Sequence, residues 1–161
     1  INADAFSAIT ITSNVDWEDP AAQNVIPNAS NRFIAETDVV SGTSSYKYVS
    51  VTARMKNPAS DLRILLDAYC DVNAEFDVYI KTLGASDTGS IDDKQWKKFT
   101  LPTYTSSVDA TDFKEHDLIT SSNMPGWTSE PFISYKIKIV GRTKNTCKPP
   151  LFKNLRSIAI T

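Results

Sequence analysis

An alternation of apolar and polar side chains in the middle of the chain constrains the fold more than any other feature. Leu62, Ile64, Leu66, Ala68 and Cys70 are each separated by one residue, and most of the intervening residues are polar. Successive side chains of an extended strand point to opposite faces, so this spacing places the five residues on one face. The pattern predicts a β-strand with one face toward a core.

The same period of two recurs elsewhere. We expect further strands at 6–12, 46–56, 76–81, 96–101, 113–119, 133–140 and 155–160. Within 46–56, Val49, Val51, Ala53 and Met55 should share the inward face. The strand at 76–81 follows the strand at 62–70 closely enough to form a hairpin with it.

The closing segments, 132–140 and 147–160, read as two neighbouring strands joined by a polar turn. The alternation turns four apolar or aromatic side chains inward: Ile133, Tyr135, Ile137 and Ile139. Lys136 and Lys138 then fall on the opposite face, and Arg156 follows the turn. We expect these three cations to face solvent or a docking partner.

Helix should be limited to short turns, because no segment carries a sustained apolar stripe at helical spacing. The best candidate is 90–96, where Ser90 could cap a turn and Asp92 and Asp93 would favour its positive end. Strands without intervening helices predict an all-β, antiparallel two-sheet β-sandwich that is jelly-roll-like, with minimal helix.

The 161 residues, 41% of them hydrophobic, fit one domain. We expect an N-terminal strand and long loop in 1–45 and the core of the sandwich in 46–161. The sequence starts with Ile1 rather than Met, which suggests that it is part of a longer protein. With 17 basic and 19 acidic residues and no long apolar stretch, we expect no nucleic-acid partner and no membrane insertion.

Residues that could carry chemistry are few. No recognised motif for a nucleophile, a metal, a phosphate or a dinucleotide occurs, so we predict no catalytic residue, no cofactor, no metal and no enzyme activity. We expect His116 to be exposed on a strand, with Glu115 and Asp117 pointing away from its face. The acidic segment 87–93 could offer oxygen ligands to Ca²⁺, but a solvated turn is the better interpretation.

Two less favoured possibilities concern the carboxylates and the cysteines. Glycosidases use paired carboxylates, and the outward faces of adjacent strands would allow such a pair among Asp67, Asp71, Glu75 and Asp77. The same residues are equally suited to an ordinary soluble surface. Cys70 and Cys147 are expected to be reduced thiols, with a disulfide only if they lie close in space.

Aromatic residues are the remaining candidates for contacts, because exposed rings bind sugars and protein partners. Six aromatic residues are candidates. Four lie on the outward register of expected strands, Tyr46, Tyr48, Tyr69 and Tyr79, and two lie in predicted loops, Trp17 and Trp127. Half-buried strand tyrosines and tryptophans that plug the ends of a sandwich would produce the same pattern.

Most of the chain from residue 46 onward resembles a domain of structural proteins in T4-like contractile-tailed phages, especially those that infect marine cyanobacteria. The segments that carry the resemblance are YKYVS at 46–50, LRILLDAY at 62–69, FDVYIK at 76–81, DDKQW at 92–96, FKEH at 113–116, and the closing segments 132–140 and 149–160. They are strand residues and include no catalytic signature.

The resemblance implies a non-enzymatic structural part of a virion, in a baseplate, neck or tail fibre. Its partners would be other virion proteins, with a symmetric homo-oligomer as one arrangement. A module that binds a host-surface glycan through exposed aromatic rings is the alternative.

Overall fold

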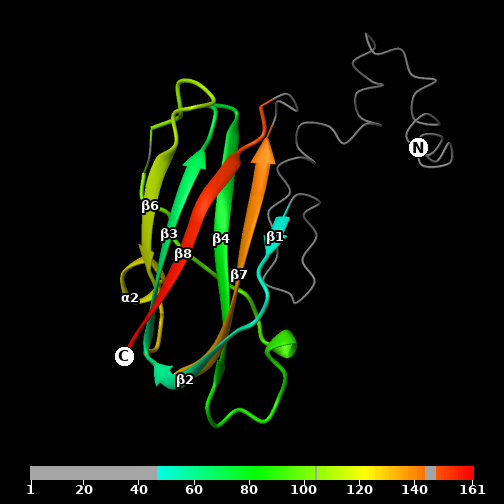
Figure 1. The fold of residues 1–161 in the computed structure, drawn as a ribbon, viewed down its shortest axis with the longest axis vertical. Helices are drawn as coiled ribbons and strands as arrows, with labels where there is room; N and C mark the ends of the chain where they lie inside the picture. The colour runs from blue at the N-terminus through cyan, green and yellow to red at the C-terminus, as the bar shows by residue number, and fades with distance from the viewer. Residues whose placement is uncertain (1–46, 104, 144–147) are drawn as a thin grey trace, which may run out of the picture. The chain divides into compact units, whose positions relative to one another are not determined.

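The computed structural model describes residues 47–103, 105–143 and 148–161 (Figure 1). The elements run in chain order as β1 (Lys47–Val49), β2 (Ala53–Ala59), β3 (Asp61–Tyr69), β4 (Ala74–Gly84), the 3-10 turn η3 (Ile91–Asp93), β5 (Lys97–Lys98), β6 (Lys114–Ile119), the one-turn helix α2 (Thr120–Asn123), β7 (Phe132–Thr143) and β8 (Leu151–Ile160). Several of the residues considered above lie outside the described residues: the strand expected at 6–12, and also Trp17, Tyr46 and Cys147. Along the described ranges, no helix is long and apolar enough to span a membrane.

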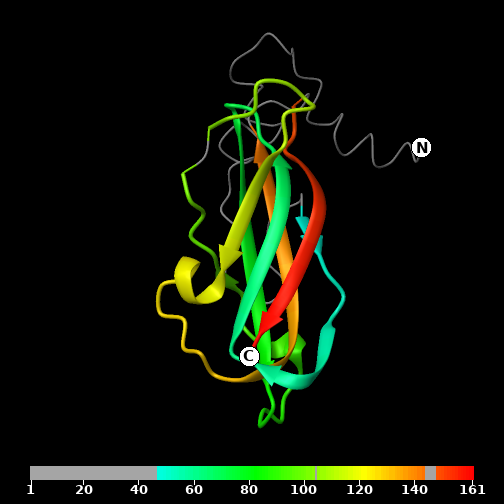
Figure 2. The same cartoon turned by 60° about the vertical axis from the view of Figure 1, so that its left-hand side comes forward.

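The strands form two antiparallel sheets. The five-stranded sheet has the order β1-β7-β4-β5, with β2 also pairing with β7, and the three-stranded sheet has the order β6-β3-β8. Figure 2 shows β6, β3 and β8 side by side, with β4 and β7 behind them. The predicted all-β class and the two-sheet antiparallel sandwich are confirmed.

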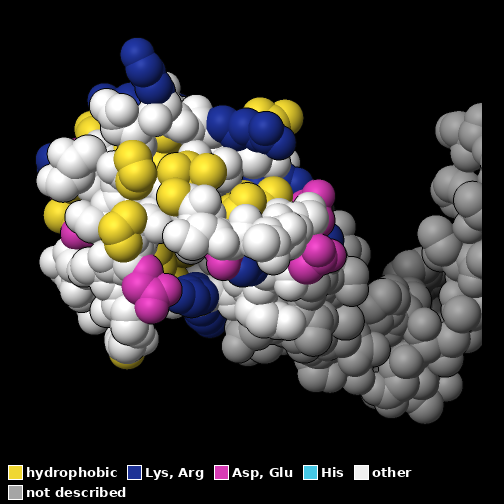
Figure 3. Space-filling model, turned by 90° about the horizontal axis from the view of Figure 1, so that it is seen from below, with side chains coloured by type: hydrophobic (Ala, Val, Ile, Leu, Met, Phe, Trp, Pro, Cys, Tyr) yellow, Lys and Arg dark blue, Asp and Glu magenta, His cyan; other side chains and the backbone are white. Residues whose placement is uncertain are grey.

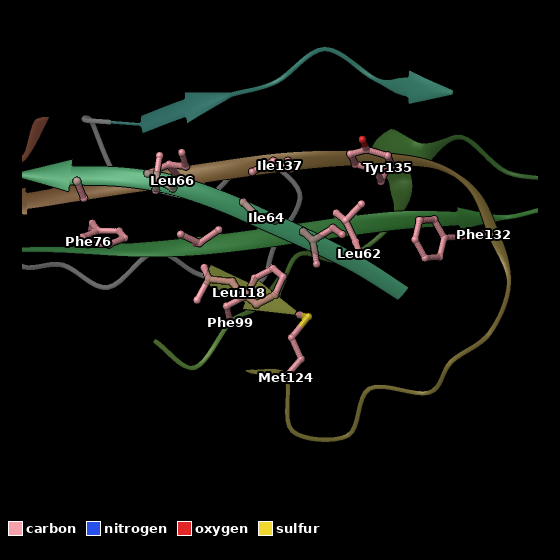
Figure 4. Packing of buried hydrophobic residues seen from close by; sticks show 14 of the residues in the cluster. Leu62, Ile64, Leu66, Phe76, Phe99, Leu118, Met124, Phe132, Tyr135 and Ile137 are labelled. Atoms are coloured by element: carbon pink, nitrogen blue, oxygen red, sulfur yellow. The ribbon is translucent and has the colours of Figure 1, made fainter. Parts of the chain in front are cut away.

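The core lies between the two sheets. Leu62, Ile64 and Leu66 of β3 are at most 1% exposed and face β4 and β7, as Figure 4 shows. Phe76 of β4 and Ile137 of β7 approach them from the other sheet. The alternation that predicted the β3 strand therefore identified its buried face correctly.

The expected hairpin between 62–70 and 76–81 is wrong. β3 pairs with β6 and β8, whereas β4 pairs with β5 and β7. The connection after Cys70 crosses from one sheet to the other, so the apolar faces of β3 and β4 lie opposite each other across the core. Burying both faces against each other requires separate sheets, because strands paired in one sheet lie side by side.

The two closing strands are not sheet neighbours either. β7 belongs to the five-stranded sheet and β8 to the three-stranded sheet. Their contact crosses the sandwich, where the hydroxyls of Tyr135 and Ser157 lie 2.8 Å apart. Apolar alternation identifies the inward face of each strand, but it does not identify the strand with which it forms hydrogen bonds.

The strand expected at 46–56 is divided into β1 and β2. At the break, the backbone N–H of Ile137 donates to the Ser50 hydroxyl, which replaces a ladder bond at 2.9 Å. Ala53 and Met55 pack against the core, but Val49 and Val51 are 44% and 87% exposed, so they do not share the expected inward face. A side chain that takes the place of a backbone partner interrupts the strand pattern.

The short turn predicted near Ser90 is confirmed. η3 has Ser90 as its N-cap, the Ser90 hydroxyl accepts from the N–H of Asp92 at 3.1 Å, and Asp93 accepts from the N–H of Ser90 at 3.3 Å. This reciprocal capping box ends the loop that follows β4. Helix α2 had no signal in the sequence.

Candidate functional site

The outer face of the five-stranded sheet carries charges that are buried. We call this set, Asp77, Lys81, Lys138 and Arg142 with the rings of Tyr79 and Trp96, the buried charged layer. Each of its four charged residues is at most 8% exposed. Burying charge is costly unless the charges are paired or held by polar and aromatic partners, so their neighbours matter.

Asp77 is the centre of the layer. Its carboxylate lies 2.8 Å from Nη2 of Arg142 and 2.8 Å from Nζ of Lys98, and it accepts a hydrogen bond from the Tyr79 hydroxyl at 3.3 Å. Glu75 lies 3.2 Å from Nε of Arg142. One carboxylate thus joins three elements, β4, β5 and β7, in a fixed arrangement.

Two lysines of the layer contact aromatic rings. Nζ of Lys138 lies 4.6 Å from the ring centre of Tyr79 and 4.7 Å from that of Trp96, and Nζ of Lys81 lies 4.7 Å from Trp96. Burial lowers the pKa of Lys81, although the nearby Asp92 acts in the opposite direction. The geometry is that of cation–π contacts shielded from water.

Lys138 therefore differs from the expectation of a solvent-facing or docking charge, because it is 1% exposed. Lys136 is also largely covered, with 18% of its side chain exposed, and pairs with Asp92 of η3 at 2.6 Å. The η3 turn and the following Trp96 lie over this face. The alternation of side chains within β7 does not predict that another segment covers the strand. Tyr79 lies opposite Lys138 in the register between β4 and β7, and the alternation within a single strand does not give this pairing.

The outer face of the three-stranded sheet is instead open to solvent. Arg63 of β3 forms a two-point pair with Asp117 of β6, with Nε and Nη2 at 2.8 and 2.6 Å from the carboxylate oxygens. Arg156 of β8 lies 3.4 Å from Glu115 of β6. The side chains in both pairs are 41 to 60% exposed. The hydrogen bonds from Arg63 lower the pKa of Asp117. We call this surface the charged sheet face.

A β-bulge shapes the β8 side of the charged sheet face. The register with β3 shifts between Leu65 and Asp67, and Asn154 adopts a positive φ of 54°. Nδ2 of Asn154 donates to Asp67 at 2.7 Å. Lys153 and Arg156 are three residues apart and would lie on opposite faces of a regular strand, but the extra residue brings both to the outer face.

His116 is buried, not exposed as expected. It is 3% exposed and lies opposite Leu66 on the core face of β6, where its ring meets Phe76 edge-on at 5.0 Å. Glu115 and Asp117 point to the outer face, as the alternation predicted. Burial lowers the pKa of His116, with Asp67 acting in the opposite direction. The physical reason is that His116 shares the inward register of β6 with the buried Leu118, which places its ring in the core.

The structure does not gather the described aromatic candidates at one place. Tyr48 is 51% exposed at the edge strand β1, whereas Tyr69 and Tyr79 are buried on the outer faces of different sheets. Trp127 is half-buried and donates from Nε1 to the carbonyl oxygen of Ser60 at 3.2 Å.

The ring of Trp127 is occupied by protein groups on two sides. Nζ of Lys97 lies 5.0 Å from its centre, and Phe132 meets it edge-on at 6.1 Å. A sugar would have to displace Lys97 to stack on that face of the ring. This geometry does not favour the glycan-binding alternative.

Of the carboxylates considered for glycoside hydrolysis, Glu75 and Asp77 share the guanidinium of Arg142, which pairs with both, and the others lie elsewhere. Asp67 belongs to the three-stranded sheet and Asp77 to the five-stranded sheet, so they lie on opposite outer faces of the sandwich. Asp71 pairs with Lys148 at 3.3 Å, and Glu75 pairs with Arg142. Among the described residues, no group of three or more His, Cys, Asp or Glu side chains could hold a metal ion.

The hollow at the end of the domain near the 84–90 loop has a volume of about 450 Å³. Its lining combines Asp87, Lys94 and Glu130 with Phe132, and the Asp87 carboxylate lies 2.9 Å from Nζ of Lys94. The hydrogen bond from Lys94 lowers the pKa of Asp87. Figure 3 shows this end of the molecule, where hydrophobic side chains are interspersed with charges of both signs. The hollow thus holds an internal ion pair and not a set of converging reactive groups.

Compared with known proteins, the chain matches no family and no curated protein. Among solved structures, it is similar to the crystal structure of the infectious bursal disease virus VP2 subviral particle, with 16% sequence identity and a TM-score of 0.34. The match covers 70% of this chain and 27% of that chain, so the chain spans about a quarter of the solved protein. A likeness at this level carries no argument about function.

Proposed function

We propose that this chain is a non-enzymatic structural module of a virion and acts through protein–protein contacts. The finer position is the baseplate, neck or tail fibre of a contractile-tailed phage, as part of a longer protein. The phage position rests on the sequence resemblance, and the contact role rests on the β8 edge of the three-stranded sheet.

The observation that carries the contact role is the state of the β8 edge. β8 is ten residues long and pairs with β3 along one side, and the other side pairs with no strand among the described residues. Ile158 and Ile160 on this strand are 49% and 38% exposed. A long edge strand with exposed apolar side chains is a ready surface for pairing with another chain.

The interior of the domain suits a rigid building block. The buried charged layer joins β4, β5 and β7 on the outer face of the five-stranded sheet, and the core packs its inner face against the other sheet. Contacts therefore hold both faces of this sheet in place. Rigid surfaces lose little conformational entropy when they bind, which favours specific assembly.

The test is to locate the chain in virus particles. Antibodies raised against the 161-residue chain should label purified virions in immunogold electron microscopy, and peptides of the chain should follow the particles through a density gradient. Label on a tail or baseplate would support the finer position. Recovery of the chain only in the particle-free fraction would contradict the proposal.

A further inference from the structure

The two outer strands of the three-stranded sheet carry opposite charges at matching positions. β6 presents Glu115 and Asp117 on the charged sheet face, and β8 presents Lys153 and Arg156. Glu115 and Lys153 both lie opposite Asp67 of β3. In the next outward-facing row, Asp117 and Arg156 both lie opposite Leu65. The two carboxylates and the two cations therefore have the same spacing along the strand direction.

The bulge at Asn154 produces this match. Between Lys153 and Arg156 lie two residues of β8, whereas a single residue separates the corresponding positions on β3 and on β6. Without the extra residue the two cations would point to opposite faces, and only one could line up with a carboxylate.

The strand directions match as well. β6 and β8 both run antiparallel to β3, so they run parallel to each other, as Figure 2 shows. A second copy shifted sideways by the width of the sheet would place its β6 beside β8 of the first copy in the same direction. Lys153 would then lie beside Glu115 of the second copy, and Arg156 beside its Asp117.

We propose that the chain associates with itself head to tail, with the β8 edge of one copy paired in parallel with the β6 edge of the next. This inference deepens the proposed structural role and rests on it, because it names the partner as a second copy. The contact joins two different surfaces, so it continues from copy to copy instead of closing as a dimer. The twist of a β-sheet rotates each copy relative to the last, which gives a ring or a helical row.

Charge favours this arrangement over a symmetric one. Pairing β8 with β8 would gather Lys153 and Arg156 of both copies, and pairing β6 with β6 would gather four carboxylates. Like charges on neighbouring strands are unfavourable. Within one copy, Arg156 pairs with Glu115, Arg63 pairs with Asp117, and Nζ of Lys153 lies 3.9 Å from the ring centre of Phe113. Exposed ion pairs and exposed cation–π contacts each contribute about 1 kcal/mol or less, so turning the β8 cations toward the next copy costs little.

A charge-swap experiment on the full 161-residue chain tests the proposal. The weight-average mass in sedimentation velocity should rise with protein concentration beyond the mass of a dimer, and should fall when about 0.5 M NaCl screens the charges. The variant K153E/R156E should associate roughly tenfold more weakly, and so should E115K/D117K. An equimolar mixture of the two variants should regain association, because each acidic edge then meets a basic one.

The matched control is R54E/K56E, which makes the same charge change on two exposed residues of β2 and should associate like the wild type. Circular dichroism of each variant checks that it folds, and the salt dependence of the wild type needs no variant. Three results would each overturn the proposal. The wild type could stay monomeric at every concentration, the wild type could stop at a dimer, or the mixture of the two variants could fail to regain association. If the isolated chain is monomeric but antibodies against it still label virions, self-association is refuted and the structural role stands.

Discussion

The ammonium group of Lys138 lies 4.6 Å from the ring centre of Tyr79, its register partner on the neighbouring strand β4. The same ammonium lies 4.7 Å from Trp96, which Lys81 also approaches at 4.7 Å. One indole ring therefore serves two buried cations on the outer face of the five-stranded sheet. A desolvated cation–π contact contributes about 2 kcal/mol, so this ring should matter for stability.

Replacing Trp96 should destabilise the fold in proportion to the loss of its ring. We expect Trp96→Leu to lower the free energy of unfolding by about 2–4 kcal/mol, since it removes buried aromatic area and two cation contacts. Trp96→Phe keeps an aromatic face and should lose clearly less. Urea unfolding followed by circular dichroism measures both. Equal losses for the two variants would show that the cation contacts contribute nothing.

The buried side of β3 could be predicted from the sequence because period two is a local property of the strand. Leu62, Ile64 and Leu66 alternate with more polar neighbours, and the fold buries all three. The capped turn at Ser90 was predictable for the same reason, since its cap and its acidic residues lie within four positions.

Strand neighbours and the buried charged layer depend on contacts between distant residues. β3 and β4 follow each other closely in the chain and still enter different sheets. Lys138 alternates with apolar residues like any solvent-facing lysine, and its burial depends on Trp96, which lies 42 positions earlier in the sequence. The matching of charges on β6 and β8 also needs the bulge at Asn154, which the alternation does not reveal.

His116 should make stability depend on pH between about 5 and 7. Burial lowers its pKa below the ordinary value of 6.5, so the unfolded chain binds the proton first as the pH falls. The free energy of unfolding should be highest above pH 6.5 and should decrease below it until the folded protein also binds the proton. Chemical unfolding at half-unit pH steps measures this slope.

His116→Leu is the control for that slope, because it keeps an apolar contact with Phe76 and removes the titrating group. The difference in stability between the wild type and this variant should change between pH 7 and pH 5. A difference that stays constant over this range would show that His116 does not titrate differently in the folded and unfolded chains.

Asp61 should stabilise the junction between β3 and α2. Its carboxylate accepts hydrogen bonds from the hydroxyls of Thr120 and Ser121 and from the N–H groups of Ser121 and Leu62, the last two at 3.0 Å. Burial acts to raise the pKa of Asp61, but these hydrogen bonds outweigh it and leave the pKa below 3.8. A lowered pKa means that the stabilisation is present at neutral pH and is lost as the pH falls through the folded-state value.

We expect Asp61→Asn to lower the free energy of unfolding at pH 7 by about 1–2 kcal/mol, because hydrogen bonds to a charged acceptor become weaker ones. The gap between this variant and the wild type should narrow in acid, where Asp61 itself becomes neutral. Glu130→Gln, a change on an exposed loop residue, is the control and should change stability little. A gap that does not narrow in acid would mean that the charge of Asp61 is not what stabilises the junction.

The bulge residue Asn154 should control both stability and the alignment of the β8 cations. Its φ of 54° suits Asn and Gly but strains a β-branched residue, and its side chain holds Asp67 at 2.7 Å. Asn154→Val should therefore lower the free energy of unfolding by about 1–3 kcal/mol. Asn154→Gly relieves the backbone and removes only the hydrogen bond, so it should lose about 1 kcal/mol or less.

Thermal unfolding ranks the stability of the two Asn154 variants, and sedimentation at one protein concentration tests whether the bulge aligns the two cations of β8. If Lys153 and Arg156 depend on the bulge for their common face, Asn154→Val should also weaken self-association, whereas Asn154→Gly should preserve it. Equal association of the two variants would show that the bulge does not set the position of the cations.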